Sequence, residues 1–354
     1  MKEGRIQVVT KTVDDLRKVV ENISTAVGTP PDTAAVLADI LVGSHLAGHD
    51  SHGIQHLPRY IREVQAGEIV PKTNPEIIEE TASTALVKGN WGWGHLTAEF
   101  ATRIGIEKAR ENGIALVSAV EANHIGRLGE YVERAAAQGV VTILVVGGFS
   151  EDNPTAAPYG GRKALLAPNP IAIGFPTLDS HPVVLDFATT QVAGGKVLLA
   201  KAKGEQMPSG CLIDKDGNPS TNPHDFLGEG ALLPFGEHKG FGIMVATEIL
   251  GRILSGADGY VNTHHGGVHF RHVGMTLIAV NSGAFSSSGQ FAGRTAELVR
   301  RIQAVPPAPG FTEVMAPGDF EHKARTSRLK QGIQIPDSTW AEVVQTAESL
   351  GVSI

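Results

Sequence analysis

Short apolar segments alternate with helical segments along most of the chain after residue 75, and this alternation constrains the possible folds most strongly. Strand-like segments at 114–120 and 140–147 lie on either side of a helical segment at 127–138. Strands that alternate with helices predict an α/β sheet, which is covered on both faces where the strands are wholly apolar. The other predicted strands are 85–87, 182–186 and 275–280, and the other predicted helices are 95–112, 189–203, 238–255 and 290–303.

The first seventy residues have a different pattern, which predicts a small helical unit. Thr12 and Asp15 match a capping box with Asp in the usual place of Glu, and start a helix that runs to about residue 27. Further helices follow Pro30 and span 54–66. The Pro-rich segment 305–310 returns the chain to this unit before a last helix. We therefore expect a helical domain built from 1–74 and 305–354, and an α/β domain over 75–304.

Composition narrows the class of protein. Hydrophobic residues make up 42% and charged residues 19%, which is typical of a soluble globular protein. A net charge of −7 argues against a nucleic-acid or anionic-membrane partner, and no apolar run is long enough to span a membrane. With one cysteine and no signal peptide, we expect a cytoplasmic protein in which Cys211 is a small buried hydrophobic residue.

The run from Asp50 to Tyr60 collects groups that can carry chemistry: Ser51, His52, His56 and Arg59. Histidine is the side chain best suited to move a proton near neutral pH, and arginine is the best clamp for a carboxylate. Such a pair suits chemistry on a small carboxylic acid. The plain alternative is a helix start beside a surface arginine.

A second cluster follows the predicted strand 114–120 and contains His124 and Arg127. Ligands bind at the carboxyl ends of strands in open α/β sheets, so His124 is a candidate site residue. The alternative is a loop histidine that donates to a carbonyl.

Two further clusters could hold phosphate or ribose groups. The first of these clusters contains Asn169 and an apolar strand that leads into Asp186, Ala188, Thr189 and Thr190. In the alternative interpretation, Thr189 or Thr190 caps the following helix. The other begins a helix with His238, Lys239 and Gly240, an unfavourable place for a lysine unless an anion binds there. The dinucleotide fingerprint G-x-G-x-x-G is missing, and only part of it occurs at 92–97.

Histidine spacing supports an alternative of another class, a metal-dependent hydrolase. One group would share a face of a helix, and a second group lies near residue 270. The two groups are His45, His49, His52 and His56, and His264, His265, His269 and His272. Gly48 and Gly53 weaken the first helix, so we expect no bound metal.

Five motifs occur in order along the chain: Ser51-His52-Gly53 with Pro58-x-Tyr60, Asn123-His124-x-Gly126-x-x-Gly129, Asn169-Pro170, Asp186-x-Ala188-Thr189 and His238-Lys239-Gly240-Phe241-Gly242. Together they resemble the type-2 malate/L-lactate dehydrogenase family of NAD(P)-dependent oxidoreductases. The resemblance covers nearly the whole chain, from about Thr12 to Asp319.

This resemblance implies a mixed sheet distinct from the Rossmann type, in which the α/β domain binds the cofactor, and a homodimer with the site near the interface. It implies His52 or His124 as proton donor or acceptor. It also implies cofactor contacts at Asp186, Ala188, Thr189, His238 and Lys239, together with a late loop containing Gly318 and Asp319.

Two positions depart from the family pattern and leave the substrate open. His56 stands where several members carry Arg. If that Arg holds the substrate carboxylate in those members, the group that holds it here must be Arg59, Arg127 or another residue. Asp319 stands where many members carry Glu. The sequence predicts hydride transfer between NAD or NADP and a small 2-hydroxy acid or 2-oxo acid, with reduction of a cyclic imine amino acid as the alternative.

Overall fold

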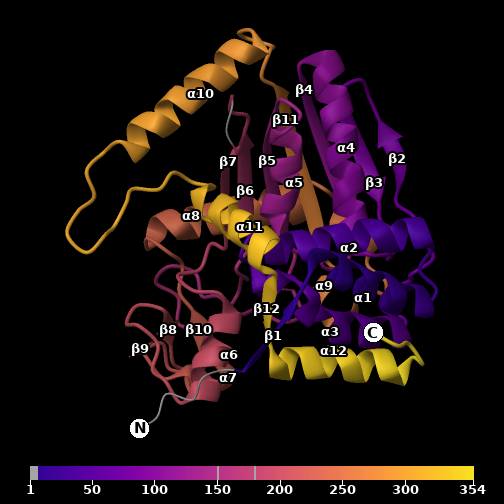
Figure 1. Cartoon of the computed structure of the whole chain (residues 1–354). Coiled ribbons are helices and arrows are strands. Elements are labelled where there is room, and N and C mark those ends of the chain that lie inside the picture. Colours follow the sequence, from indigo (N-terminus) through magenta and orange to yellow (C-terminus); the bar gives the residue numbers. More distant parts are fainter. Residues whose placement is uncertain (1–6, 150, 179–180) are drawn as a thin grey trace.

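The computed structural model describes residues 7–149, 151–178 and 181–354, and its centre is a seven-stranded mixed sheet (Figure 1). Only β3 and β4 pair in parallel among its neighbouring strands, and the other pairs are antiparallel. The mixed-sheet α/β fold is therefore confirmed. In spatial order the strands are β2 (Glu76–Glu80), β3 (Thr84–Lys88), β4 (Ile114–Val120), β11 (Gly274–Asn281), β5 (Val140–Gly147), β6 (Ile171–Phe175) and β7 (Val183–Phe187).

Helices cover both faces of this sheet. Successive residues of a strand point to opposite faces, and β11 shows this directly. Leu277 faces α4 (Gly94–Asn112), where a Cβ on Gly105 would lie 2.6 Å from its Cδ2. The adjacent Thr276 hydroxyl donates to the carbonyl of Leu250 on the other face, 2.7 Å away. The helix α5 (Leu128–Ala136) lies beside α4, and α8 (His238–Glu248) continues as a π-helical turn (Ile249–Ile253) on the second face.

A second core joins the two ends of the chain. Residues from Leu16 to Ile69 pack with Ile333, Ile335, Val343 and Ala347. The capping box of the first helix is confirmed, because the Thr12 side chain accepts from the Asp15 N–H at 3.1 Å. The expected domain boundaries at residues 74 and 305 stay a prediction. The elements here are β1 (Val8–Lys11), α1 (Val13–Ala26), α2 (Pro31–Leu46), 3₁₀ turns at Asp50–His52 and Ile54–His56, α3 (Leu57–Gln65), β12 (Ile333–Pro336) and α12 (Asp337–Ser349).

A small lobe between β7 and α8 was not predicted. Cys211 is buried in its apolar centre, as expected from the sequence. The predicted helix 189–203 begins only at Gly194, because Thr189 and Thr190 pair with Pro168 and Pro234 in extended structure, and Ala193 is the N-cap residue. The capping role considered for these threonines is therefore wrong. The lobe contains α6 (Gly194–Lys203), β8 (Leu212–Ile213), β9 (Pro219–Ser220), α7 (Pro223–Leu227) and β10 (Ala231–Leu232).

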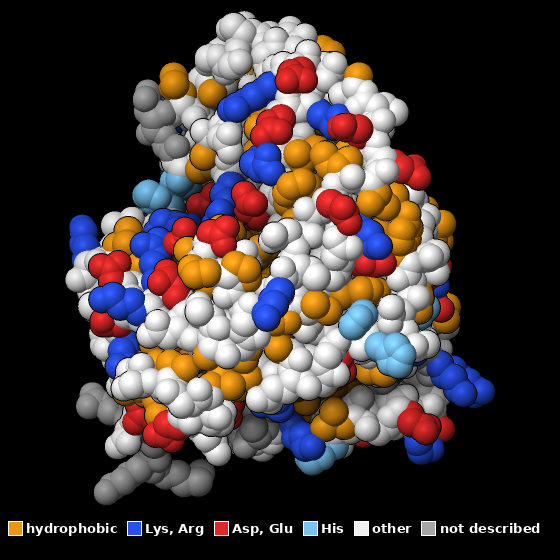
Figure 2. Space-filling view, turned by 90° about the vertical axis from the view of Figure 1, so that its right-hand side faces the viewer, with side chains coloured by type: hydrophobic (Ala, Val, Ile, Leu, Met, Phe, Trp, Pro, Cys, Tyr) orange, Lys and Arg blue, Asp and Glu red, His pale blue; other side chains and the backbone are white. Residues whose placement is uncertain are grey.

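The remaining elements lie at the edges of the molecule. Figure 1 shows α10 (Ser288–Gln303) standing apart at the upper left, joined by a long segment to α11 (Asp319–Gln331). A 3₁₀ turn (Ala257–Tyr260) and α9 (Gly267–Phe270) precede β11. On the face in Figure 2, basic and acidic side chains are interspersed with apolar ones. Among the described residues, no helix is long and apolar enough to cross a membrane.

Candidate active site

The carboxyl ends of β4, β5 and β7 border a cavity of about 500 Å³. These strands run in the same direction, because β11 and β6 lie between them in antiparallel pairs. His124, Phe149 and Asp186 therefore meet at one edge of the sheet, as the strand-end argument predicted for His124. Its lining includes His49, Ser51, His52, His124, Arg127, Phe149, Pro168, Pro170, Asp186, Ala188, Thr190, Gln191, Gly194, Lys196 and Val273.

The two predicted catalytic histidines lie together in this cavity. The rings of His52 and His124 are nearly parallel, with centroids 6.2 Å apart. Burial lowers the pKa of His52, although the Asp186 carboxylate opposes this, and burial and the Arg59 charge lower the pKa of His124. Both imidazoles are therefore neutral at pH 7 and able to accept a proton.

Tyr60 connects His124 to a second buried histidine. The Tyr60 hydroxyl lies 2.6 Å from Nδ1 of His124 and 3.5 Å from Nε2 of His95. Burial raises the pKa of Tyr60, so the phenol keeps its proton. Burial also lowers the pKa of His95 and of the neighbouring His56 to about 3. The sequence placed Tyr60 in a motif without a role, and it missed His95, whose one signal was the partial glycine motif around it.

Arg127 combines burial with unused hydrogen-bonding capacity. Its side chain is 1% exposed and pairs with Glu133 at 2.9 Å and Glu130 at 3.6 Å. Its Nε and Nη1 atoms have no hydrogen-bond partner within the described part of the chain. Burial alone would lower the pKa of Arg127, but Glu130, Glu133 and Asp186 raise it. A buried cation with free donors at a cavity wall is suited to hold a carboxylate.

The other two predicted substrate residues differ in position. Ser51 lines the cavity, and its hydroxyl lies 3.0 Å from Nδ1 of His52. Arg59 does not line it. Its guanidinium lies over the ring of Tyr60 at 5.0 Å and pairs with Glu63 at 3.3 Å.

The predicted cofactor residues fall into three groups. Asp186, Ala188 and Thr190 line the cavity, and the Asp186 carboxylate accepts from the N–H of Gly129 at 2.7 Å. Asn169 and Thr189 are fully buried behind its wall. His238 and Lys239 lie exposed at the start of α8, with Gly240 buried beside them, while Gly318 and Asp319 lie at the start of α11.

Asp319 belongs to a second, smaller cavity of about 260 Å³. Its carboxylate accepts from the Ala316 N–H at 2.6 Å and the Gln303 amide at 2.9 Å, and lies 2.8 Å from Nε2 of His181. The structure therefore does not bring the late loop to the cavity that holds His52.

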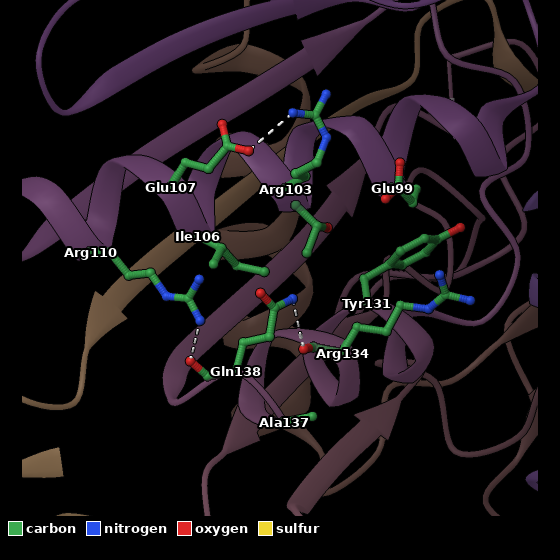
Figure 3. Close-up of a pocket in the computed structure, with 10 residues that line it drawn as sticks. Glu99, Arg103, Ile106, Glu107, Arg110, Tyr131, Arg134, Ala137 and Gln138 are labelled. Carbon is green, nitrogen blue, oxygen red and sulfur yellow. Dashed lines mark hydrogen bonds and ion pairs between the residues drawn. The ribbon is translucent and has the colours of Figure 1, made fainter.

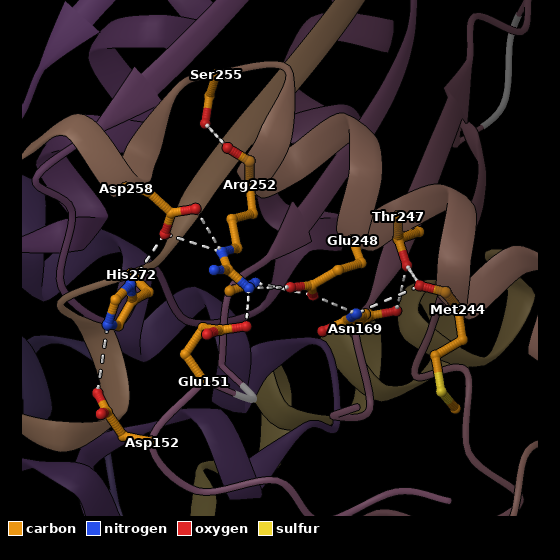
Figure 4. Close-up of polar contacts among 11 residues, drawn as sticks. Glu151, Asp152, Asn169, Met244, Thr247, Glu248, Arg252, Ser255, Asp258 and His272 are labelled. Atoms are coloured by element: carbon orange, nitrogen blue, oxygen red, sulfur yellow. Dashed lines mark hydrogen bonds and ion pairs between the residues drawn. The ribbon is translucent and has the colours of Figure 1, made fainter. Parts of the chain in front are cut away.

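A network of paired charges holds the loops that form another part of the wall (Figure 4). Glu248 accepts from the Asn169 amide at 2.7 Å and the Gly148 N–H at 3.0 Å, and Arg252 lies 3.3 Å from its other oxygen. Arg252 also pairs with Glu151 and Asp258, and Asp258 in turn contacts His272 at 2.9 Å. Because Gly148, Asn169 and His272 are adjacent in sequence to cavity-lining residues, this network positions the wall.

Sequence reasoning missed Lys196, which lies exposed in the first turn of α6 at the rim of the cavity. Lys196 follows two glycines at a helix start, so its sequence signal is similar to that of Lys239.

A groove of about 530 Å³ lies between α4 and α5 (Figure 3). Its arginines already have partners. Arg103 pairs with Glu107 at 3.1 Å, Arg110 donates to the Gln138 carbonyl at 2.8 Å, and Arg134 pairs with Glu130. None of the expected site residues lines this groove.

The helical face proposed for His45, His49, His52 and His56 does not exist. The helix α2 ends at Leu46 and Gly48 has a φ of +83°, so the last three residues lie in loops and 3₁₀ turns. Among the described residues, no group of three or more His, Cys, Asp or Glu side chains could hold a metal ion.

Comparison with known proteins decides the family. Residues 12–344 match the family described as malate/L-lactate dehydrogenase. The chain belongs to the malate/L-lactate dehydrogenase family. This membership confirms the resemblance carried by the motifs.

Relatives of this dehydrogenase family member cover nearly its full length. An L-sulfolactate dehydrogenase of Methanocaldococcus jannaschii is 34% identical over 96% of both chains. The solved structure of an Entamoeba histolytica malate dehydrogenase has a TM-score of 0.91 and 26% identity, covering 98% of this chain and 99% of that one. A Δ1-piperideine-2-carboxylate reductase from Pseudomonas syringae has a TM-score of 0.84 and 30% identity, covering 96% of this chain and 100% of that one.

Proposed function

We propose that this protein transfers hydride between a nicotinamide cofactor, NAD or NADP, and C2 of a small 2-hydroxy acid or 2-oxo acid. One observation carries the proposal: the neutral histidines His52 and His124 share a cavity with the buried, partly unpaired guanidinium of Arg127. Family membership and the activities that the relatives are named for support the same chemistry.

The Arg127 donors bind the substrate carboxylate and thereby orient C2. In the direction of oxidation, His52 or His124 takes the proton of the C2 hydroxyl, and in reduction it returns that proton. For His124 the base is Nε2. When Nδ1 donates to the Tyr60 oxygen and the phenol points toward His95, Nε2 keeps its lone pair.

The residues present fit a nicotinamide cofactor. Two buried polar atoms, Oγ1 of Thr189 and Oδ1 of Asn169, have no hydrogen-bond partner in the part of the chain that the structure describes. The cofactor, when bound, accepts the hydride from C2 or returns it. Asp186, Ala188, Thr189, Thr190 and Asn169 would hold it at the cavity.

Six further residues complete the proposed set at positions outside this cavity. His238 and Lys239 would contribute from the exposed start of α8. Gly240 and Gly318, with Asp319, would contribute through helix starts. Arg59 would assist substrate binding together with Ser51, which lines the cavity.

The test is the change in nicotinamide absorbance with a panel of acids and both cofactors. The panel contains malate, lactate, sulfolactate and ureidoglycolate with their 2-oxo counterparts. We expect turnover with at least one acid. No turnover on any acid, together with no shift in unfolding temperature on adding NAD(H) or NADP(H), would contradict the proposal.

A second candidate is reduction of a cyclic imine carboxylate, favoured by the structural likeness to the Pseudomonas syringae reductase. Such a substrate also has a planar C2 beside a carboxylate, so the same cavity would bind it. Adding a cyclic imine to the panel in the reductive direction separates the two candidates.

The proposal also includes a homodimer located in the cytoplasm. Sedimentation of the purified protein with and without cofactor measures the oligomeric state, and we expect twice the 37.2 kDa of one chain.

A further inference from the structure

The helix α11, near the carboxyl terminus, packs across the end of α2, where the turn that carries His52 begins (Figure 1). Nothing in the proposed chemistry uses this helix beyond its first residue. Its later residues nevertheless contact Asp50, the first residue of the turn Asp50–His52, and the residues just before it.

Arg328 forms the centre of these contacts. Its guanidinium binds both carboxylate oxygens of Asp50, with Nη2 at 3.1 Å from Oδ2, and donates to the carbonyl of His45 at 2.6 Å. Asp50 lies 278 residues earlier in the chain. Arg328 therefore ties the end of α2 and the first residue of the turn to one point on α11.

His45 closes the other side of the turn. Its ring is 3% exposed, its Nε2 accepts from the Ile54 N–H at 3.0 Å, and its Nδ1 lies 2.7 Å from Asp50. With Nε2 as acceptor, Nδ1 carries the proton and donates to Asp50. The backbone between these partners has no free space, because a Cβ on Gly53 would lie 2.2 Å from His45 Nε2.

A second contact lies about two turns earlier on the same face of α11. Glu321 lies 2.8 Å from Nε2 of His49, which lines the cavity. The ring of Phe320 packs on Gly48, where a Cβ would lie 2.9 Å away. The residues on both sides of Asp50 are thus fixed by α11 and by α2.

The ion pair between Arg328 and Asp50 keeps both charges near neutral pH. Burial opposes ionisation of Asp50, but hydrogen bonds from His45 and Arg328 hold the pKa of this carboxyl well below its usual value. This ion pair therefore holds the turn without depending on pH in this range.

We propose that Arg328, with Asp50 and His45, is a positioning residue that acts through His52, by holding the 3₁₀ turn so that the imidazole faces the cavity. The inference rests on the proposed role of His52 in proton transfer. It assigns part of the catalytic geometry to residues of α11 that lie outside the proposed substrate and cofactor contacts.

A double-mutant cycle tests this proposal, using Arg328→Met, His52→Gln and the combined variant. We expect Arg328→Met to lower kcat by about tenfold to a hundredfold, because a displacement near 1 Å costs rates of this order. A primary deuterium isotope effect on kcat should rise in the same variant, because hydride and proton transfer become slower than product release. In the His52→Gln background, Arg328→Met should change kcat by less than about twofold.

Two further variants separate positioning from stability. Arg328→Lys keeps one charged donor and should recover part of kcat. Lys330→Met removes an exposed cation from the same helix and should leave kcat and the isotope effect unchanged. Unfolding temperature is measured for all variants, and rates are compared only where each protein is folded. If Arg328→Met does not fold, Arg328→Lys and Asp50→Asn replace it in the cycle.

The outcomes are distinguishable. If His52→Gln alone has normal kcat, the proposed role of His52 fails and this inference fails with it. If His52→Gln is impaired but Arg328→Met lowers kcat by the same factor in both backgrounds, the proposed function stands and the positioning role of Arg328 is overturned. A folded Arg328→Met variant with kcat within about twofold of the unchanged protein also overturns it.

Discussion

Two polar clusters border the same cavity and differ in how their hydrogen-bonding groups are satisfied. In the histidine cluster of His52, His56, His95 and His124, burial keeps the rings neutral, and Nδ1 of His95 has no partner within the described residues. In the network around Glu248 and Arg252, each charge meets an opposite one. The histidine cluster is therefore neutral and keeps an unpaired ring nitrogen, whereas the network that holds the loops pairs each of its charges.

The largest effect should come from the histidine cluster. Replacing His124 with Gln removes a proton acceptor of the cavity, and we expect kcat to fall about 10²- to 10⁴-fold. Cofactor binding, measured by fluorescence titration, should change little. His224→Gln, at an exposed site in the small lobe, is the matched control. Normal turnover in His124→Gln would assign proton transfer to His52.

The paired network should respond in stability instead. Glu248→Gln leaves Arg252 with less opposing charge in a partly buried site, and we expect the free energy of unfolding to fall by about 1–3 kcal/mol. Denaturant unfolding measures it. Glu297→Gln, from an exposed pair on α10, should cost about 0.5 kcal/mol or less. Equal losses in the two variants would mean that the network stabilises the fold no more than an exposed ion pair does.

The histidine cluster should also make stability depend on pH. The folded pKa of His95 is about 3, below the ordinary value of 6.5, so between these values the unfolded chain binds a proton that the folded chain does not. Stability therefore falls as pH decreases below 6.5, and at pH 5 this residue alone accounts for about 2 kcal/mol.

Denaturant unfolding of His95→Gln between pH 5 and pH 7.5 checks this sign. Its free energy of unfolding should fall less steeply with decreasing pH, by about 1.4 kcal/mol per pH unit. An unchanged slope would mean that His95 binds its proton over the same pH range in the folded protein as in the unfolded chain.

The smallest effect should come from Tyr60→Phe, which removes only the hydroxyl between His124 and His95. We expect kcat to fall about tenfold, since one hydrogen bond to the reacting imidazole is worth about 1–1.5 kcal/mol. The acid limb of the kcat/KM profile against pH should shift as well. A variant with altered unfolding temperature but unchanged kcat would make Tyr60 a packing residue.

Local sequence signals predicted much of the fold and part of the site. Apolar strands such as 114–120 and 140–147, and the cap at Thr12, depend on neighbours along the chain, so their pattern is readable. His52, His124 and Asp186 were found because they lie in motifs or at strand ends. The helix α11 was missed because it is polar on most of its surface and has no apolar period.

By itself, the sequence determined the alternation of strands and helices, the family motifs, and the residue types able to move a proton or bind a carboxylate. Only the tertiary structure decided that β1 pairs with β12, that Tyr60 joins His124 to His95, and that Arg328 reaches Asp50. It also decided that Arg59 packs on Tyr60 while Arg127 belongs to the lining of the cavity. The physical reason is that burial and long-range pairing arise when distant segments pack, and these set which side chains remain neutral, unpaired and exposed to a ligand.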